Sequence, residues 1–148
     1  MPSEQQIEVY KQHRASQEKY VYFLLAAVGA AIALAVTQTQ GSRLSYSQIP
    51  LAFAVALWAL SFFFGCKHLG YVESTLFANA ELLKVQAGQH PRTGGNSEFI
   101  EVASEGIREA IDSNSKWAAR FARWQFSSLV AGATAYLGWH VLEMWLRS

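Results

Sequence analysis

The fold is decided by two apolar stretches, residues 51–66, LAFAVALWALSFFFGC, and residues 126–146, FSSLVAGATAYLGWHVLEMWL. Residues 67–124 between them are rich in charged side chains and have the apolar spacing of a helical hairpin. A chain with this alternation is expected to enter a membrane, leave it on one side, fold back and re-enter. The sequence therefore predicts an all-α integral membrane protein.

A further apolar stretch, YVYFLLAAVGAAIALAV, occupies residues 20–36. It is slightly shorter than the roughly 20 residues that a bilayer core requires, and residues 37–39 complete it. We therefore predict three transmembrane helices, at residues 20–39, 50–66 and 125–146. A cleaved signal peptide is the alternative for the first stretch, because residues 33–35 resemble a cleavage site. The long leading region contains several acids, which argues against that alternative: Glu4, Glu8 and Glu18.

Composition restricts the other classes of function. The 148 residues suffice for one domain, and the mean hydropathy of +0.09 averages over apolar spans and polar helical regions. Cys66 is the single cysteine, so an internal disulfide and a multi-cysteine metal cluster are excluded. No nucleophile triad and no carboxylate pair in an apolar setting is visible, so we expect neither an enzyme nor a cofactor. Basic residues are interleaved with acids, which argues against binding to duplex nucleic acid.

The polar segments are expected to be helical as well. Residues 1–19 are predicted to form an N-terminal helix outside the bilayer, where Ser3 and Gln6 fit a capping box. Residues 38–49 form a short loop, and Pro50 suits the first turn of the second helix, where its missing N–H costs nothing.

Residues 67–124 are predicted to form a cytoplasmic hairpin that extends the second and third spans. The first arm runs to Ala87 with Gly88 as its C-cap, and its apolar stripe is Leu69, Val72, Leu76 and Leu83, with Asn79 in the same stripe. The second arm starts at Asn96 or Ser97 and follows a heptad: Ile100, Ala103, Ile107, Ala110, Asn114, Trp117, Phe121 and Trp124. Together with the third span it makes a helix on the order of 70 Å long, so about half of it must stand in water.

Lys and Arg set the expected orientation. The N-terminal helix and the hairpin hold ten of the twelve basic residues, and only Arg43 and Arg147 lie on the other side. The positive-inside rule then places the N-terminus and the hairpin in the cytoplasm and the C-terminus outside. Three basic residues lie at the inner interface, either as topology determinants or as contacts for lipid headgroups: Lys67, Arg120 and Arg123.

Several polar groups have a structural interpretation. Glu143 lies near the outer interface, four residues before Arg147, which favours a simple ion pair. His140 is similarly close to the surface, and no buried partner for a proton relay can be named. Cys66 and His68 lack the four ligands that structural zinc needs, so no metal site is expected.

Two candidate sites remain. The loop before the third helix contains Arg92, Thr93, Gly94, Gly95 and Ser97, which are the components of a site for a small anionic ligand at a helix N-terminus. A plain hairpin turn is the alternative, because three glutamates follow at once and the GK[ST] element of a P-loop is absent. Gly65 and Gly70 flank the inner interface as a possible hinge, or as small residues for close packing.

Two functions are compatible with this architecture. Small residues recur in the first and third spans and allow close approach of helices in lipid. Together with the heptads they favour a homo-oligomer that forms a pore, or acts as a membrane effector, controlled through the hairpin. The alternative is a non-catalytic accessory or scaffold subunit that binds other membrane proteins. The layout resembles small bacterial membrane effectors of nucleotide-triggered defence systems in architecture, without a shared motif, which implies a multi-pass protein of the bacterial inner membrane.

Overall fold

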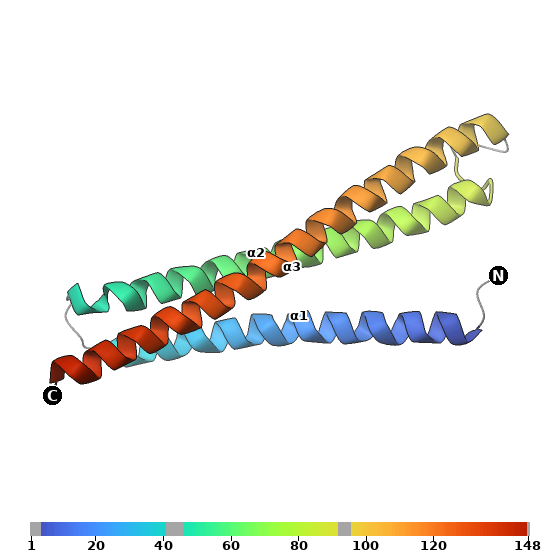
Figure 1. Cartoon of the computed structure of the whole chain (residues 1–148). Coiled ribbons are helices and arrows are strands. Elements are labelled where there is room, and N and C mark those ends of the chain that lie inside the picture. The colour runs from blue at the N-terminus through green and yellow to red at the C-terminus, as the bar shows by residue number, and fades with distance from the viewer. Residues whose placement is uncertain (1–3, 41–45, 92–95, 148) are drawn as a thin grey trace. The chain divides into compact units, whose positions relative to one another are not determined.

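A computed structural model describes residues 4–40, 46–91 and 96–147 of the chain. This part of the chain is entirely helical, as predicted, and contains three long helices (Figure 1). They are α1 (Glu4–Thr39), α2 (Ile49–Gln86) and α3 (Ser97–Arg147), and a short 3₁₀ helix, η1 (Tyr46–Gln48), precedes α2. Pro50 lies in the first turn of α2, as expected. Ser3, the predicted cap of the first helix, lies outside the described residues.

Two of these helices are long and apolar enough to cross a membrane, by length and composition. The stretches are Ala15–Thr39 and Ile49–Gln86, each with a mean hydropathy of 2.1. Only 22% and 28% of their apolar windows are buried inside the structure, whereas the core helix of a soluble protein is mostly buried. In the described part of the chain α3 does not qualify by the same measure. The three-span topology therefore stays a prediction.

α1 joins two segments that the sequence treats separately. Residues 1–19 and 20–39 are predicted as distinct segments, yet the helix continues from Glu4 to Thr39 without a break. At its end, the hydroxyl of Thr37 donates to the carbonyl of Leu34 (2.8 Å), and that of Thr39 donates to the carbonyl of Ala35 (3.1 Å). The Thr39 hydroxyl also donates to the carbonyl of Val36 (3.0 Å), which belongs to the last turn and has no N–H partner within the helix.

The chain forms two compact units. The first comprises residues 1–65 and 125–148, and the second comprises residues 66–124. α1 belongs to the first unit, whereas α2 and α3 are each divided between the two units.

The core of the first unit is built from all three helices. Val28 and Ala35 of α1 cluster with Leu51 and Trp58 of α2, and Leu129 of α3 packs against them. Buried residues follow spacings of three and four, which is the pattern of coiled-coil packing: Val21, Leu24 and Val28 on α1, and Leu51, Ala54, Trp58, Ser61 and Gly65 on α2.

Gly132 allows α3 to approach the Trp58 ring closely. A Cβ on Gly132 would lie 2.6 Å from two atoms of the Trp58 indole and 3.1 Å from the carbonyl oxygen of Ala54. Such separations are not tolerated between real atoms, so this position requires glycine. The Trp58 ring also packs against Tyr136 at a centroid distance of 5.6 Å, and its Nε1 donates to the carbonyl of Leu129 (3.4 Å).

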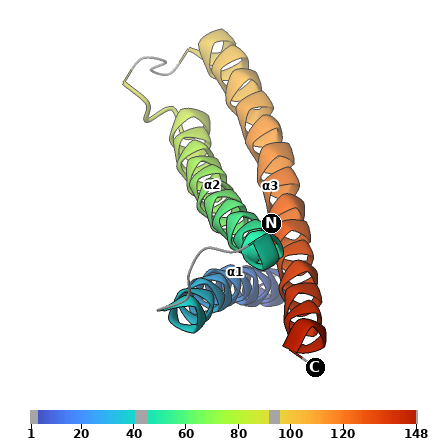
Figure 2. The same ribbon diagram turned by 90° about the vertical axis from the view of Figure 1, so that its left-hand side faces the viewer.

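The second unit pairs residues 66–86 of α2 with residues 97–124 of α3 (Figures 1 and 2). The predicted heptad agrees with the observed packing in part, since five of its eight positions are half-buried: Ile100, Ala103, Ile107, Asn114 and Phe121. Ala110, Trp117 and Trp124 are exposed, while Ser104 and Ala118 are buried. The buried and half-buried positions of α3 follow an unbroken three-four spacing: Ser104, Ile107, Ile111, Asn114, Ala118 and Phe121. The two fully buried positions of α3 in this unit carry small side chains, Ser104 and Ala118, whereas both indoles are exposed.

The stripe on α2 is also only partly as predicted. Leu69, Val72 and Leu76 are half-buried, but Leu83 is 68% exposed and Asn79 is exposed as well. Val85, which is 2% exposed, takes the inner position instead.

The two arms of this unit end in well-formed caps. Gly88 has a φ of 68°, its N–H donates to the carbonyl of Val85, and the N–H of Gln89 donates to that of Lys84 (3.0 Å each). This is the Schellman arrangement, and it confirms Gly88 as the C-cap glycine. At the start of α3, the Asn96 side chain accepts from the N–H of Glu98 at 3.0 Å, which makes Asn96 the N-cap.

Candidate functional site

Ser61 and Gly65 of α2 and Gln125 of α3 form a buried layer that contains two polar side chains. Leu25 of α1 lies against the same layer, so all three helices of the first unit meet there. Ser61 is fully buried and Gln125 is 1% exposed, and the Ser61 hydroxyl donates to the Gln125 main-chain carbonyl at 2.8 Å. A Cβ on Gly65 would lie 2.6 Å from Gln125 Nε2 and 2.7 Å from Leu25 Cδ2 of α1. The absence of a side chain at Gly65 is therefore what admits the amide of Gln125.

The amide of Gln125 carries an unusual energetic cost. Its Nε2 is buried and has no hydrogen-bond partner. Leaving such a donor unsatisfied costs about 1–3 kcal/mol, so natural proteins keep few of them. Gln125 is a residue that sequence reasoning missed, because the heptad was placed on Trp117, Phe121 and Trp124. The spacing from Ala118 through Phe121 to Gln125 was the signal that could have found it.

The two proposed hinge glycines lie in different surroundings. Gly65 is buried against Gln125 and Leu25, whereas Gly70 is exposed and a Cβ there would meet nothing within 4 Å. Of these two glycines, only Gly65 makes the contacts that the close-packing alternative requires. The hinge itself stays a prediction.

Four rings form an aromatic ladder in the second unit: Tyr71, Trp117, Phe121 and Trp124. Tyr71 of α2 stacks on Phe121 (5.5 Å, 15° between planes) and on Trp117 (6.4 Å, 19°) of α3. Phe121 in turn meets Trp124 edge to face at 5.5 Å. Aromatic contacts of this kind contribute more to the free energy of folding than their buried area alone. The ladder therefore stabilises the packing of α2 on α3 within the second unit.

Of the three predicted interface basic residues, Arg120 contacts this ladder. Lys67, Arg120 and Arg123 are all exposed, and the Arg120 guanidinium lies over the Trp117 ring at 5.1 Å from its centroid. Lys116, the other cation of this stretch, forms an ion pair with Asp112 at 2.6 Å.

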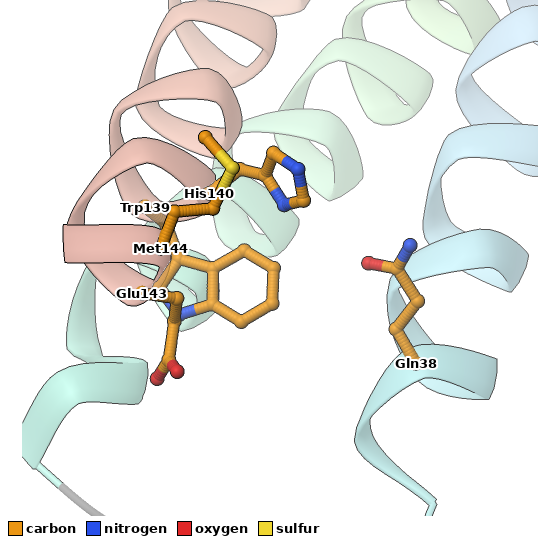
Figure 3. A pocket seen from close by; sticks show the side chains of 5 residues that line it. All are labelled: Gln38, Trp139, His140, Glu143 and Met144. Atoms are coloured by element: carbon orange, nitrogen blue, oxygen red, sulfur yellow. The ribbon is translucent and has the colours of Figure 1, made fainter. Parts of the chain in front are cut away.

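A small cavity of about 230 Å³ lies near the ends of α1 and α3 (Figure 3). Its lining is Gln38, Trp139, His140, Glu143 and Met144. Gln38 faces the α3 residues across the cavity, and its Oε1 accepts a hydrogen bond from the Tyr136 hydroxyl at 2.6 Å. The volume is below the range of about 300–1,000 Å³ that is usual for small-molecule sites.

The loop predicted to bind an anion is described only at its edges. Arg92, Thr93, Gly94 and Gly95 lie outside the described residues, and Ser97 is exposed at the start of α3. The cap formed by Asn96 uses one of the first N–H groups of the helix, namely that of Glu98. The ligand-binding role of this loop stays a prediction.

Glu81 is held by two basic side chains near the C-terminal end of α2. Its carboxylate lies 2.7 Å from Lys84 Nζ and 3.8 Å from His90 Nε2. The hydrogen bond from Lys84 lowers the pKa of Glu81, with further help from the charges of Lys84 and His90, while partial burial acts in the opposite direction. This network stabilises the last turns of α2.

The described residues contain no group of three or more His, Cys, Asp and Glu side chains that could hold a metal ion. Cys66 is exposed. Comparison with protein-family models, with curated proteins and with solved structures finds no match to the chain.

Proposed function

We propose that the chain is a multi-pass membrane protein in which α1, α2 and the second half of α3 cross the bilayer. The N-terminus and residues 67–124 lie in the cytoplasm, and the C-terminus lies outside. The apolar side chains that face outward in the first unit support this placement, among them Phe23 (68% exposed), Phe53 (61%) and Leu137 (63%). Contact of this apolar surface with lipid is favourable, whereas its contact with water is unfavourable.

The protein acts as a homo-oligomer that forms a pore or disrupts the membrane as an effector. The observation behind this proposal is an unoccupied small-residue face on α1. Ala26, Gly29, Ala30 and Ala33 are all exposed, and a Cβ on Gly29 would meet nothing within 4 Å. In lipid, faces of this kind let two helix backbones approach closely, and packing rather than hydrophobicity drives the association.

Control of the oligomer passes through residues 67–124. α2 and α3 continue from one unit into the other without a break. A change in the packing of the cytoplasmic arms is therefore transmitted along helices that also lie in the membrane. No span carries a polar stripe that would line a wide pore, so the channel is narrow or forms only on activation.

A Gly29→Leu substitution tests the oligomer, because Gly29 is exposed and a Cβ there meets no neighbour within 4 Å in the protomer. Native mass spectrometry after gentle extraction should give a defined ring of identical copies for the unmodified chain and smaller species for the variant. Ala56→Leu, on an exposed position of α2, is the matched control. Dye or ion flux through liposomes that contain only this protein should follow the oligomer. A tight bilayer at high protein loading would contradict the pore.

An accessory or scaffold subunit is the second candidate. Its supporting observation is a set of exposed aromatic side chains with room for a different protein: Phe62 (46%), Phe63 (51%), Trp117 (39%) and Trp124 (47%). This function predicts a stable complex with other membrane proteins on extraction at natural expression levels. Repeated recovery of the protein alone would count against it.

A further inference from the structure

We propose that Lys67, Tyr71, Trp117, Arg120, Arg123 and Trp124 form a headgroup-binding patch for an anionic phospholipid. The inference rests on the membrane placement proposed above and adds a ligand of defined chemistry to it. All six residues belong to the second unit, so the patch depends on contacts within one compact part of the chain.

The aromatic rings of Tyr71 and Trp117 pack against each other and hold the patch in a defined arrangement. Tyr71 of α2 stacks near-parallel on both Phe121 and Trp117 of α3, and these two rings meet each other at 6.0 Å, so the two helices present their rings as one cluster. Trp117 is 39% exposed and Trp124 is 47% exposed. Indole rings with one polar edge prefer the boundary between headgroups and acyl chains, where both parts find a suitable environment.

Arg120 supplies a cation beside the rings. Its guanidinium lies over the Trp117 ring at 5.1 Å, within the range of a cation–π contact. A planar fork of N–H donors matches two oxygens of a phosphate. Trp117 therefore keeps the Arg120 guanidinium at the surface of the rings, where a phosphodiester can meet it.

Neighbouring charges reinforce the selection for an anion. Arg123 lies three residues after Arg120, on the next turn of the same side of α3, and Lys67 lies one turn before Tyr71 on α2. Residues 49–72 and 113–142 contain no Asp or Glu. Lys116 is not part of the patch, because Asp112 binds it at 2.6 Å.

A lipid fits the patch better than a soluble acidic partner. Lys67 and Tyr71 follow directly on the apolar residues 51–66 of α2, and Trp117 to Trp124 directly precede the apolar residues of α3. Basic and aromatic residues at this point of a membrane helix meet the headgroup layer. A lipid can bring its phosphate to Arg120 while its acyl chains cover the neighbouring apolar surface.

The test is lipid titration of the full-length protein in detergent, read by native mass spectrometry. The two probes are phosphatidylglycerol and phosphatidylcholine with the same acyl chains. The unmodified protein should bind phosphatidylglycerol at least about 25-fold more tightly, since each of the two arginines near an anionic lipid contributes roughly fivefold. The double variant Arg120→Gln/Arg123→Gln should lose about 25-fold in affinity for phosphatidylglycerol and little for phosphatidylcholine.

Two variants sharpen the result. Lys84→Gln/Arg108→Gln removes the same net charge from elsewhere in the second unit and should leave the preference intact. Trp117→Ala should weaken phosphatidylglycerol binding severalfold although every charge remains, because Arg120 loses its support. Circular dichroism and gel filtration identify any variant that does not fold.

Equal binding of the two lipids would overturn the inference, as would an equal loss in the charge-matched control. Binding of a poly-glutamate peptide by the same arginines, without a preference for phosphatidylglycerol, would assign the patch to an acidic protein instead. Lipid binding is counted per protomer, so a failed oligomer does not affect this readout. A protein that is not recovered from membranes at all would refute the proposed function itself.

Discussion

Ser61 of α2 donates its hydroxyl proton to the main-chain carbonyl of Gln125 on α3, and both residues are almost completely buried. The bond crosses between two helices at the level where the Gln125 side chain lies against Gly65. One polar contact and one unsatisfied amide thus occupy the same layer of an otherwise apolar bundle. Buried polar groups of this kind set helix register in coiled coils at some cost in stability, and we expect the same here.

Substitutions at Gln125 should reveal what the buried amide costs in thermal stability. Gln125→Met removes the unsatisfied Nε2 with little change in volume, so thermal unfolding in detergent should occur at an equal or higher temperature. Gln125→Glu buries a carboxylate without a cation and should lower it clearly. If Gln125→Met is instead the more damaging of the two, the amide makes a favourable contact that this account lacks.

Ser61→Ala should cost about 1 kcal/mol, because the Gln125 carbonyl loses its side-chain donor while the packing is retained. The measurement is chemical or thermal unfolding followed by circular dichroism. Ser74→Ala is the matched control, since the Ser74 hydroxyl donates within its own helix to the carbonyl of Gly70 and is exposed. An equal effect of both substitutions would contradict a special role for the layer.

Glycines in contact and glycines in open space should respond oppositely to alanine. Gly132→Ala places a Cβ 2.6 Å from the Trp58 ring and 3.1 Å from the Ala54 carbonyl oxygen, and should destabilise the protein by about 1–3 kcal/mol. Gly65→Ala meets the ends of the Gln125 and Leu25 side chains, which shift more readily, and should destabilise the protein by less. Gly70→Ala and Gly138→Ala meet nothing within 4 Å and should stabilise it by about 0.5–1 kcal/mol, because alanine favours the helix. Loss of activity in Gly70→Ala without loss of stability would support the hinge.

The Glu81 network should make stability depend on acid pH. Lys84 holds the pKa of Glu81 below its ordinary value of 4.5, so the folded state favours the carboxylate. The contribution is therefore complete above that value and is lost as the pH falls through the lower pKa of the folded state. Glu81→Gln should flatten the dependence of the melting temperature between pH 6 and pH 3, by comparison with Glu73→Gln on the same helix. An unchanged slope in Glu81→Gln would refute the assignment.

The helices and their caps were readable from the sequence because they depend on local signals. Gly88 and Asn96 each supply a chemical group that a helix end requires, and both occupy the predicted places. The faces by which α2 and α3 pack on each other were harder to predict. The heptad spacing assigned Trp117 and Trp124 to the inner face, but both are exposed, and the fully buried positions of α3 in this unit are Ser104 and Ala118.

The buried polar layer could not be predicted from the sequence alone. Gln125 directly precedes the apolar run of α3 and resembles an ordinary interface residue. Its burial depends on Gly65, which lies 60 residues earlier, and on Leu25 from a third helix. Contacts between distant segments decide such a site. The patch around Arg120 was partly visible, because the basic residues are evident in the sequence, whereas the stacking of Tyr71 on Phe121 is a property of the fold.

The most direct test of the membrane placement is the sidedness of single cysteines in a Cys66→Ser background. Positions 8, 46 and 97 are exposed and report, in order, the N-terminus, the first loop and the hairpin, and position 148 follows the third predicted span and reports the C-terminus. With a membrane-impermeant maleimide and intact cells, positions 46 and 148 should react at once, and positions 8 and 97 only after permeabilisation. Protection of position 148 together with position 97 would show that α3 does not cross the membrane, and reaction of all four positions in intact cells would contradict the placement altogether.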